Sequence, residues 1–149
     1  MKKLIVLLSA CLVPSLMGYP QNIPPDEVPA PVKKAFAIKF PAATSIKYEM
    51  EKKDYEVTFK DKGVGMSANF DATGKWLETE TVIKESDLPK EVSASIARNF
   101  ADFRISEITQ VETPNKGLIF EIVLKTDIEG YEVRISPKGN VLKTTPLKK

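Results

Sequence analysis

The fold is decided by a stretch that occurs twice, VPAPVKKAFAIKF at residues 28–40 and LPKEVSASIARNF at residues 88–100. In each stretch three apolar side chains recur at a spacing of four residues: Val32, Phe36 and Phe40 in the first, and Val92, Ile96 and Phe100 in the second. Apolar residues at this spacing share one face of an α-helix, and a proline is tolerated only in the first turn. The sequence therefore predicts two short amphipathic helices whose starts lie 60 residues apart.

Each predicted helix is followed by segments in which apolar and polar side chains alternate. A period of two is typical of antiparallel strands that have one face covered and one face in water. We expect strands near residues 46–51, 55–60, 64–70 and 75–83 after the first helix, and near 105–112, 118–125, 131–136 and 141–145 after the second.

Each run of strands also contains a late turn, FDATGK at residues 70–75 and ISPKGN at residues 135–140. These turns are 65 residues apart, so the second run carries about five extra residues, which we assign to a hairpin tip at 113–117. The predicted fold class is α+β. We expect a tandem of two helix-plus-antiparallel-sheet units, with about four strands each, at residues 29–84 and 85–149.

The N-terminus predicts export. A short basic start with Lys2 and Lys3 is followed by an uncharged, mostly apolar run up to Gly18, which is typical of a secretory signal peptide at residues 1–18. Residues 19–28 are rich in proline, and we expect them to form an extended leader. This places the mature protein in the periplasm or outside the cell. Alternatively, Leu8-Ser9-Ala10-Cys11 resembles a lipobox, in which case Cys11 would carry a lipid and tether an outer-membrane lipoprotein.

The composition excludes several function classes. Without Lys2 and Lys3, 20 of the 22 basic residues remain against 20 acidic residues, and the sequence contains no basic cluster of the kind that binds nucleic acid. The chain has no histidine, and Cys11 is its only cysteine. Ser-His and Cys-His nucleophile pairs and the usual zinc sites are therefore ruled out. We expect no cofactor and no metal.

The organisation resembles the PepSY-like family of exported bacterial proteins, also described as β-lactamase-inhibitor-like. The motifs that carry this resemblance span most of the chain: Val28-Pro29 to Phe40-Pro41, Tyr55-Glu56-Val57, Phe70-Asp71 to Gly74-Lys75, and Leu88-Pro89 to Phe100. The resemblance implies a tandem of helix-plus-sheet units whose strands form one curved surface. In β-lactamase inhibitory proteins the concave side of that surface binds the enzyme.

Placing the apolar faces inward leaves an opposite sheet face on which a protein or peptide in the cell envelope could dock. On this face we predict Trp76, in register with Glu78 and Glu80, as the anchor of the interface, because large aromatic residues dominate binding hot spots. Ile119, Val123 and Val141 would extend the apolar patch. The alternative is that a one-residue bulge turns Trp76 into a core, or that these residues seal the join between the units.

The predicted function is a non-enzymatic binding or inhibitor-like module. The alternative is an envelope structural or accessory protein without a discrete site, which predicts a polar outer face and a buried Trp76. The carboxylates of Glu78 and Glu80 lie about 7 Å apart along one strand, but such spacing arises readily by chance and we expect no catalysis. The turn Asp71-Ala72-Thr73-Gly74 lacks the further ligands of an EF-hand, so we interpret it as a hairpin turn.

Overall fold

The computed structural model describes residues 21–147, which form one antiparallel sheet of nine strands and two α-helices. The nine strands lie side by side in the order in which they occur along the chain. The predicted signal peptide and Cys11 lie outside the described residues. Within residues 21–147 neither α-helix is long and apolar enough to span a membrane.

The helices are α1 (Ala30–Lys39) and α2 (Lys90–Asn99), and a 3-10 turn, η1 (Glu85–Asp87), precedes α2. The strands are β1 (Gln21–Ile23), β2 (Thr44–Glu51), β3 (Asp54–Asp61), β4 (Val64–Phe70), β5 (Trp76–Val82), β6 (Arg104–Thr113), β7 (Gly117–Lys125), β8 (Gly130–Ile135) and β9 (Val141–Pro146).

Both helices and all eight strands predicted from the sequence are confirmed to within about two residues. The proline-rich segment differs from the prediction, because residues 21–23 form a ninth strand that pairs with β2. Val28 is also buried in the core beneath α1. Part of the predicted leader is therefore built into the fold.

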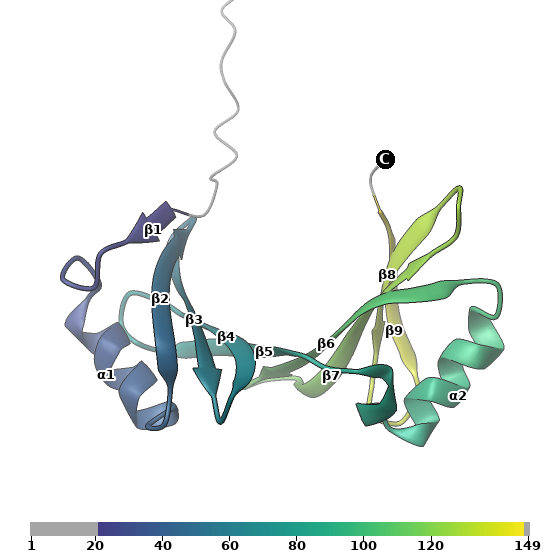
Figure 1. Cartoon of the computed structure of the whole chain (residues 1–149), viewed down its shortest axis with the longest axis horizontal. Helices are drawn as coiled ribbons and strands as arrows, with labels where there is room; N and C mark the ends of the chain where they lie inside the picture. The colour runs from purple at the N-terminus through teal and green to yellow at the C-terminus, as the bar shows by residue number, and fades with distance from the viewer. Residues whose placement is uncertain (1–20, 148–149) are drawn as a thin grey trace, which may run out of the picture.

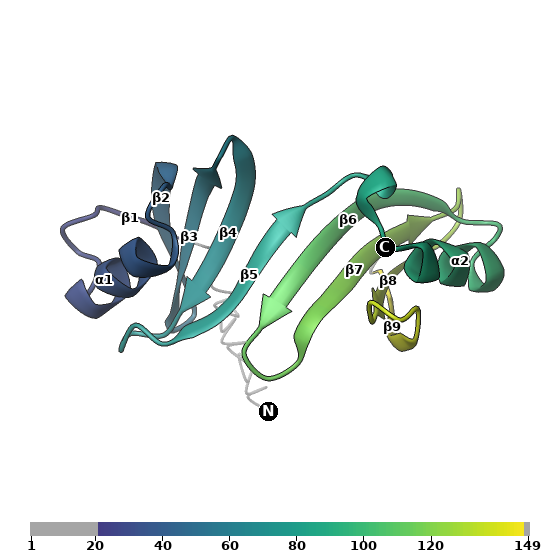
Figure 2. The same cartoon turned by 90° about the horizontal axis from the view of Figure 1, so that it is seen from below.

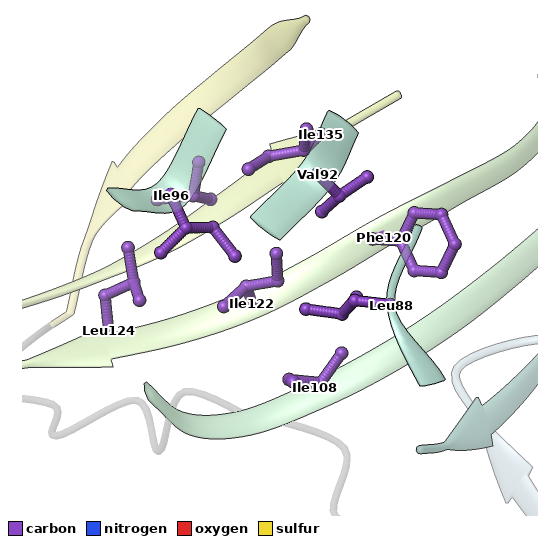
Figure 3. Close-up of a cluster of buried hydrophobic side chains, with 9 residues drawn as sticks. Leu88, Val92, Ile96, Ile108, Phe120, Ile122, Leu124 and Ile135 are labelled. Carbon is purple, nitrogen blue, oxygen red and sulfur yellow. The ribbon is translucent and has the colours of Figure 1, made fainter. Parts of the chain in front are cut away.

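Each helix packs on its own half of the sheet. Val32 and Phe36 of α1 are buried against β3 and β4, and the rings of Phe36 and Phe59 lie 4.9 Å apart, edge to face. Beneath α2 the buried side chains are aliphatic apart from one phenylalanine: Leu88, Val92, Ile96, Ile108, Phe120, Ile122, Leu124, Val133 and Ile135. Figure 3 shows Val92 and Ile96 of α2 directed at the side chains of the strands. The protein thus has two hydrophobic cores.

The sheet is curved, and both helices lie on its convex side (Figure 1). Seen from that side, α1 and α2 cover the two ends of the sheet and leave the middle strands uncovered (Figure 2). The opposite side, which we call the concave face, carries no helix.

A glycine in each half allows a hairpin to touch the first turn of its helix. Gly74 and Gly139 have φ angles of 83° and 79°, and both sit in the late turns noted in the sequence. A Cβ atom on Gly74 would lie 2.5 Å from the carbonyl oxygen of Pro31, and one on Gly139 would clash in the same way with the carbonyl of Glu91. Pro31 and Glu91 are themselves 60 residues apart. The same helix-to-hairpin contact therefore occurs in both halves.

The two halves are joined by the ladder between β5 and β6, which contains only four residue pairs, from Thr79–Glu112 to Val82–Thr109. The first residues of β5, Trp76 to Glu78, have no partner on β6. Figure 2 shows the two strands diverging towards the β6–β7 hairpin. The junction is therefore the most sparsely paired part of the sheet between β2 and β9.

Replacing Gly74 or Gly139 by alanine should destabilise the protein, and Gly63→Ala is the matched control. All three glycines have positive φ, but a Cβ on Gly63 would meet nothing within 4 Å. The control should cost about 1 kcal/mol for the left-handed backbone, and the other two should cost roughly 1–3 kcal/mol more for the clash. Urea unfolding followed by the fluorescence of Trp76, the only tryptophan, measures this. Equal losses at all three positions would contradict the contact.

Candidate functional site

The strand register places four rows of side chains on the concave face, and most of them are polar. The rows are Glu49, Glu56, Asn69 and Glu78; Lys47, Thr58, Ser67, Glu80, Val111 and Ile119; Val82, Thr109, Glu121, Arg134 and Lys143; and Glu107, Val123, Glu132 and Thr145. The first three rows start in the half that contains α1, and the second and third rows cross the junction. The concave face is therefore a continuous surface that both halves supply.

Trp76 is not on this face, and its predicted register with Glu78 is wrong. A bulge in β5 pairs Trp76 with Phe70 and Glu78 with Asn69, so Leu77 becomes the extra residue. Trp76 packs partly buried against the core beneath α1, and its indole Nε1 donates a hydrogen bond to Thr79 Oγ1 at 2.9 Å. Lys39 Nζ, at the end of α1, lies 3.6 Å from the centre of the Trp76 ring. These contacts tie α1 to β5.

Val141 is displaced from the predicted patch by a second bulge at the matching position. β9 pairs Val141 with the fully buried Ile135, and Lys143 with Arg134, so Leu142 is the extra residue. Val141 therefore belongs to the helix-bearing side of the sheet, at its edge, where it is 40% exposed. Trp76 and Val141 are 65 residues apart, as are the two late turns.

Ile119 and Val123 do lie on the concave face, as the alternation in the sequence predicted. Val123 is half-buried, but Ile119 is only 5% exposed and pairs with Val111, which is 2% exposed. The expected exposed patch is therefore a recessed apolar floor. It belongs to neither of the two cores beneath the helices.

This floor lies in a hollow of about 250 Å³, which we call the junction hollow. Its walls come from the diverging part of β5 and from the β6–β7 hairpin, whose tip contains the extra residues predicted at 113–117. The residues that line it are Lys75, Trp76, Leu77, Glu78, Val111, Thr113, Pro114, Asn115, Lys116, Ile119, Glu121 and Arg134. The hollow opens where β5 and β6 stop pairing, so residues from both halves are needed to form it.

Of the five charged residues that line the junction hollow, Glu121 and Arg134 pair with each other, and Arg134 also lies near Glu132. Arg134 Nη2 lies 2.8 Å from Glu121 Oε1, and Arg134 Nε lies 3.7 Å from Glu132 Oε1. The Glu78 carboxylate accepts a hydrogen bond from Asn69 Nδ2 at 3.0 Å. Burial nevertheless raises the pKa of Glu121, because its effect outweighs the opposing effect of the Arg134 guanidinium. The rim of this hollow thus carries three cationic and two acidic side chains, with one ion pair among them.

Two further carboxylates on the concave face are held in a less favourable environment. Burial raises the pKa of Glu56 and of Glu80, and the surrounding glutamates raise both further, while a hydrogen bond with Ser67 partly opposes the shift at Glu56. Arg134 opposes the shift at Glu80 only weakly. Like charges and partial desolvation both disfavour ionisation of a carboxyl group. The middle of the concave face therefore has an excess of negative charge.

No group of three or more His, Cys, Asp or Glu residues in the described part of the chain is arranged to hold a metal ion. The turn at Asp71 uses its carboxylate internally, because Oδ1 accepts hydrogen bonds from the backbone N–H groups of Thr73 and Lys75. The Thr73 hydroxyl also donates to Oδ1, and this bond is the main reason that the pKa of Asp71 is lowered. The carboxylate therefore stabilises the hairpin turn.

The sequence indicated one wall of the junction hollow but not the residues of β5 that line it. The extra residues at 113–117 indicated that the second unit differs from the first in this hairpin, and they form one wall. The predicted alternation, with Trp76 on the outer face, places the neighbouring Leu77 in the core, whereas Leu77 lines the hollow. Trp76 and Leu77 are adjacent apolar residues, so alternation alone does not decide which of them faces inward.

Trp76→Ala should destabilise the protein by about 2 kcal/mol, because it removes a large, partly buried side chain from the core. Trp76→Phe keeps most of the apolar contact and loses the hydrogen bond to Thr79, so a smaller loss is expected. Urea unfolding followed by circular dichroism distinguishes the two. An unchanged midpoint for Trp76→Ala would show that Trp76 has no structural role.

Glu80→Gln should stabilise the protein at pH 7 and have no such effect at low pH. Because the pKa of Glu80 is raised in the folded state above the ordinary value of 4.5, the wild-type protein gains stability as the pH falls from the raised pKa to 4.5. The gain from Gln at pH 7 should be at most about 0.5 kcal/mol, since solvent screens a half-exposed group. Thermal unfolding between pH 4 and 8 measures it, with Glu112→Gln on the opposite face as the control. A gain that persists at pH 4 would contradict the assignment.

The fold is shared with solved structures from Bacteroides. A BLIP-like protein from Bacteroides fragilis NCTC 9343 is 23% identical and superimposes with a TM-score of 0.77, which covers 89% of this chain and 91% of that one. A "putative periplasmic" protein from Bacteroides eggerthii DSM 20697 is 24% identical, with a TM-score of 0.75 and coverage of 80% and 88%. A DUF2874 family protein from Bacteroides ovatus ATCC 8483 is also 24% identical, with a TM-score of 0.75 and coverage of 79% and 86%.

A search of curated protein sequences finds no match to this chain. The sequence profile of the family described as "Putative beta-lactamase-inhibitor-like, PepSY-like" matches residues 19–67 and 55–143. The two matches overlap and together extend over most of the chain, in agreement with the resemblance noted in the sequence. The chain belongs to this β-lactamase-inhibitor-like, PepSY-like family.

Proposed function

We propose that the protein is an exported, non-enzymatic binding module that recognises a protein or peptide through its concave face. The observation that carries this proposal is the junction hollow. It combines a recessed apolar floor, Val111 and Ile119, with a charged rim on the side of the sheet that has no helix. An apolar centre surrounded by polar groups is the usual anatomy of a protein interface.

The site residues of the proposal are therefore revised. Ile119 and Val123 remain on the binding face, and Leu77 is added at the junction hollow. Trp76 also lines this hollow but is removed as the anchor, because it packs against the core beneath α1. Val141 is removed because it belongs to the helix-bearing side of the sheet.

The comparisons support this proposal without identifying a partner. The family is described as β-lactamase-inhibitor-like, and one similar structure is called a BLIP-like protein. At 23% identity that likeness concerns the fold alone, so inhibition of a β-lactamase is not part of our proposal. We propose that the chain is exported after removal of residues 1–18, so its partner would be in the cell envelope. The similar protein from Bacteroides eggerthii is described as periplasmic, which agrees with this location. Lipidation of Cys11 remains the alternative route to the envelope.

We also propose that the two halves are copies of one ancestral unit. Three features recur at matching positions and support this: the contact of Gly74 or Gly139 with the helix start, the bulge at Leu77 or Leu142, and a separate core under each helix. The units run from about residue 29 to 84 and from 85 to 149. The strand at residues 21–23 extends the first unit beyond the predicted boundary.

One observation favours the alternative function, an accessory protein of the envelope with no discrete site. That alternative predicts that Trp76 is withdrawn from the surface, and Trp76 does pack against a core. It also predicts a uniformly polar outer face, to which the apolar floor at Val111 and Ile119 is an exception.

Arginine substitutions on the two sides of the sheet test the binding face. Thr58→Arg and Val123→Arg place a bulky side chain on the concave face, whereas Ala37→Arg and Ala94→Arg place one on exposed positions of α1 and α2. The four variants and the wild type are used to retain proteins from an envelope extract, which are identified by mass spectrometry. The retained partner should be lost, by about tenfold or more, only with the concave-face variants. Loss only with the helix variants, or with none, would contradict the proposal.

A further inference from the structure

A second hollow lies on the concave face, and it differs from the junction hollow in its charge. It has a volume of about 400 Å³ and spans β3 to β6. Three glutamates and three hydroxyl-bearing residues line it: Glu56, Glu80, Glu107, Thr58, Ser67 and Thr109. We call it the acidic hollow.

The glutamates of the acidic hollow have no cationic partner. Within residues 21–147 no lysine or arginine lines the hollow, and none of the three glutamates takes part in an ion pair. Lys47 and Lys60 lie next to it by strand register and make no such pair either. At the junction hollow, by contrast, Arg134 pairs with Glu121 at 2.8 Å. One hollow is compensated by the protein itself, and the other lacks a positive charge.

The acidic hollow also has an apolar wall. Val82 lines it and is 63% exposed, and it stands in the row next to Glu80. At Gly65 a Cβ atom would meet nothing within 4 Å, so the backbone leaves this side open. Lysine and arginine carry a long aliphatic stem with a charge at its end, and they bury the stem against apolar surface. An exposed valine beside uncompensated carboxylates is complementary to such a side chain.

We propose that the acidic hollow receives a lysine or arginine side chain from an extended segment of the partner protein. This proposal rests on the proposed function, because it specifies what the concave face binds. The hydroxyl groups of Thr58, Ser67 and Thr109 can accept hydrogen bonds, so they and the carboxylates suit the several N–H donors of arginine.

The spacing of the two hollows favours an extended segment as the occupant. Glu80 and Val82 of β5 line the acidic hollow, and Leu77 and Glu78 of the same strand line the junction hollow. Two to four residues of a strand span about 7–13 Å. A peptide that runs along β5 would therefore present a basic side chain to the acidic hollow and an apolar side chain, two to four residues away, to the junction hollow.

The test uses two synthetic peptides that differ in a single charge. Ac-Gly-Leu-Ala-Arg-Ala-Gly-NH2 is titrated into the isotope-labelled protein, followed by amide chemical shifts, beside the same peptide with neutral citrulline in place of arginine. The arginine peptide should shift the amides of Gly65, Ser67 and Thr109 saturably, and the citrulline peptide should bind at least tenfold more weakly. Glu80→Gln should weaken the arginine peptide about tenfold, whereas Glu132→Gln, a control outside both hollows, should leave its Kd unchanged.

Three results would overturn the proposal: equal binding of the two peptides, no loss with Glu80→Gln, or binding of spermidine as tight as that of the arginine peptide. Selection from a display library of random hexapeptides separates this failure from failure of the proposed function. Selected peptides that lose binding to the Thr58→Arg variant but carry no enriched basic residue would overturn the proposal and leave concave-face binding intact. If no peptide is selected, the proposal falls, and the envelope-extract experiment with the concave-face variants decides whether the proposed function falls with it.

Discussion

The structure depends on a mismatch between the length of its helices and the width of its sheet. A ten-residue helix is about 15 Å long, whereas nine strands span about 38 Å at the usual strand spacing. One such helix cannot cover the convex side, so each half has its own helix and its own core. The middle of the convex side stays uncovered, and the side chains that β5 and β6 present to solvent there are accordingly polar: Thr81, Gln110 and Glu112. The apolar residues of the junction, Val111 and Ile119, are on the opposite side.

The same arrangement explains why the concave face is suited to binding. With both helices on the convex side, nothing in the described part of the chain covers the four rows of polar side chains, and the curvature recesses the middle rows. Two hollows lie on this face, one at the separated ends of β5 and β6 and one beside Glu80. Lys75, Lys116 and Arg134 line the first hollow, and no lysine or arginine of the described residues lines the second. The two hollows therefore differ in charge, and this difference would fix the direction in which a partner segment lies on the proposed binding face.

The sequence predicted the helices, eight strands and the fold class because these depend on periodicity within short segments. It missed β1, whose three residues are too few to show a period. It also misplaced Trp76 and Val141, because each is followed by another apolar residue, Leu77 and Leu142, and either member of such a pair satisfies the alternation. The bulge that decides between them follows directly on the hairpin that packs on the helix start, which is a tertiary contact. The acidic hollow was beyond reach for the same reason, since its glutamates come from three strands and meet only through the register.

The four-pair ladder between β5 and β6 has a mechanical consequence. The bending stiffness of a sheet depends on the hydrogen bonds at each cross-section, and between β2 and β9 the ladder with the fewest pairs is this one, which no helix covers. The junction is therefore the natural flexure of the molecule, with a stiff plate on each side. Small rotations of one plate against the other change the radius of curvature of the concave face while leaving both cores intact. The distance between two groups on opposite plates is thus easily changed, and it would set how broad a partner surface fits the proposed binding face.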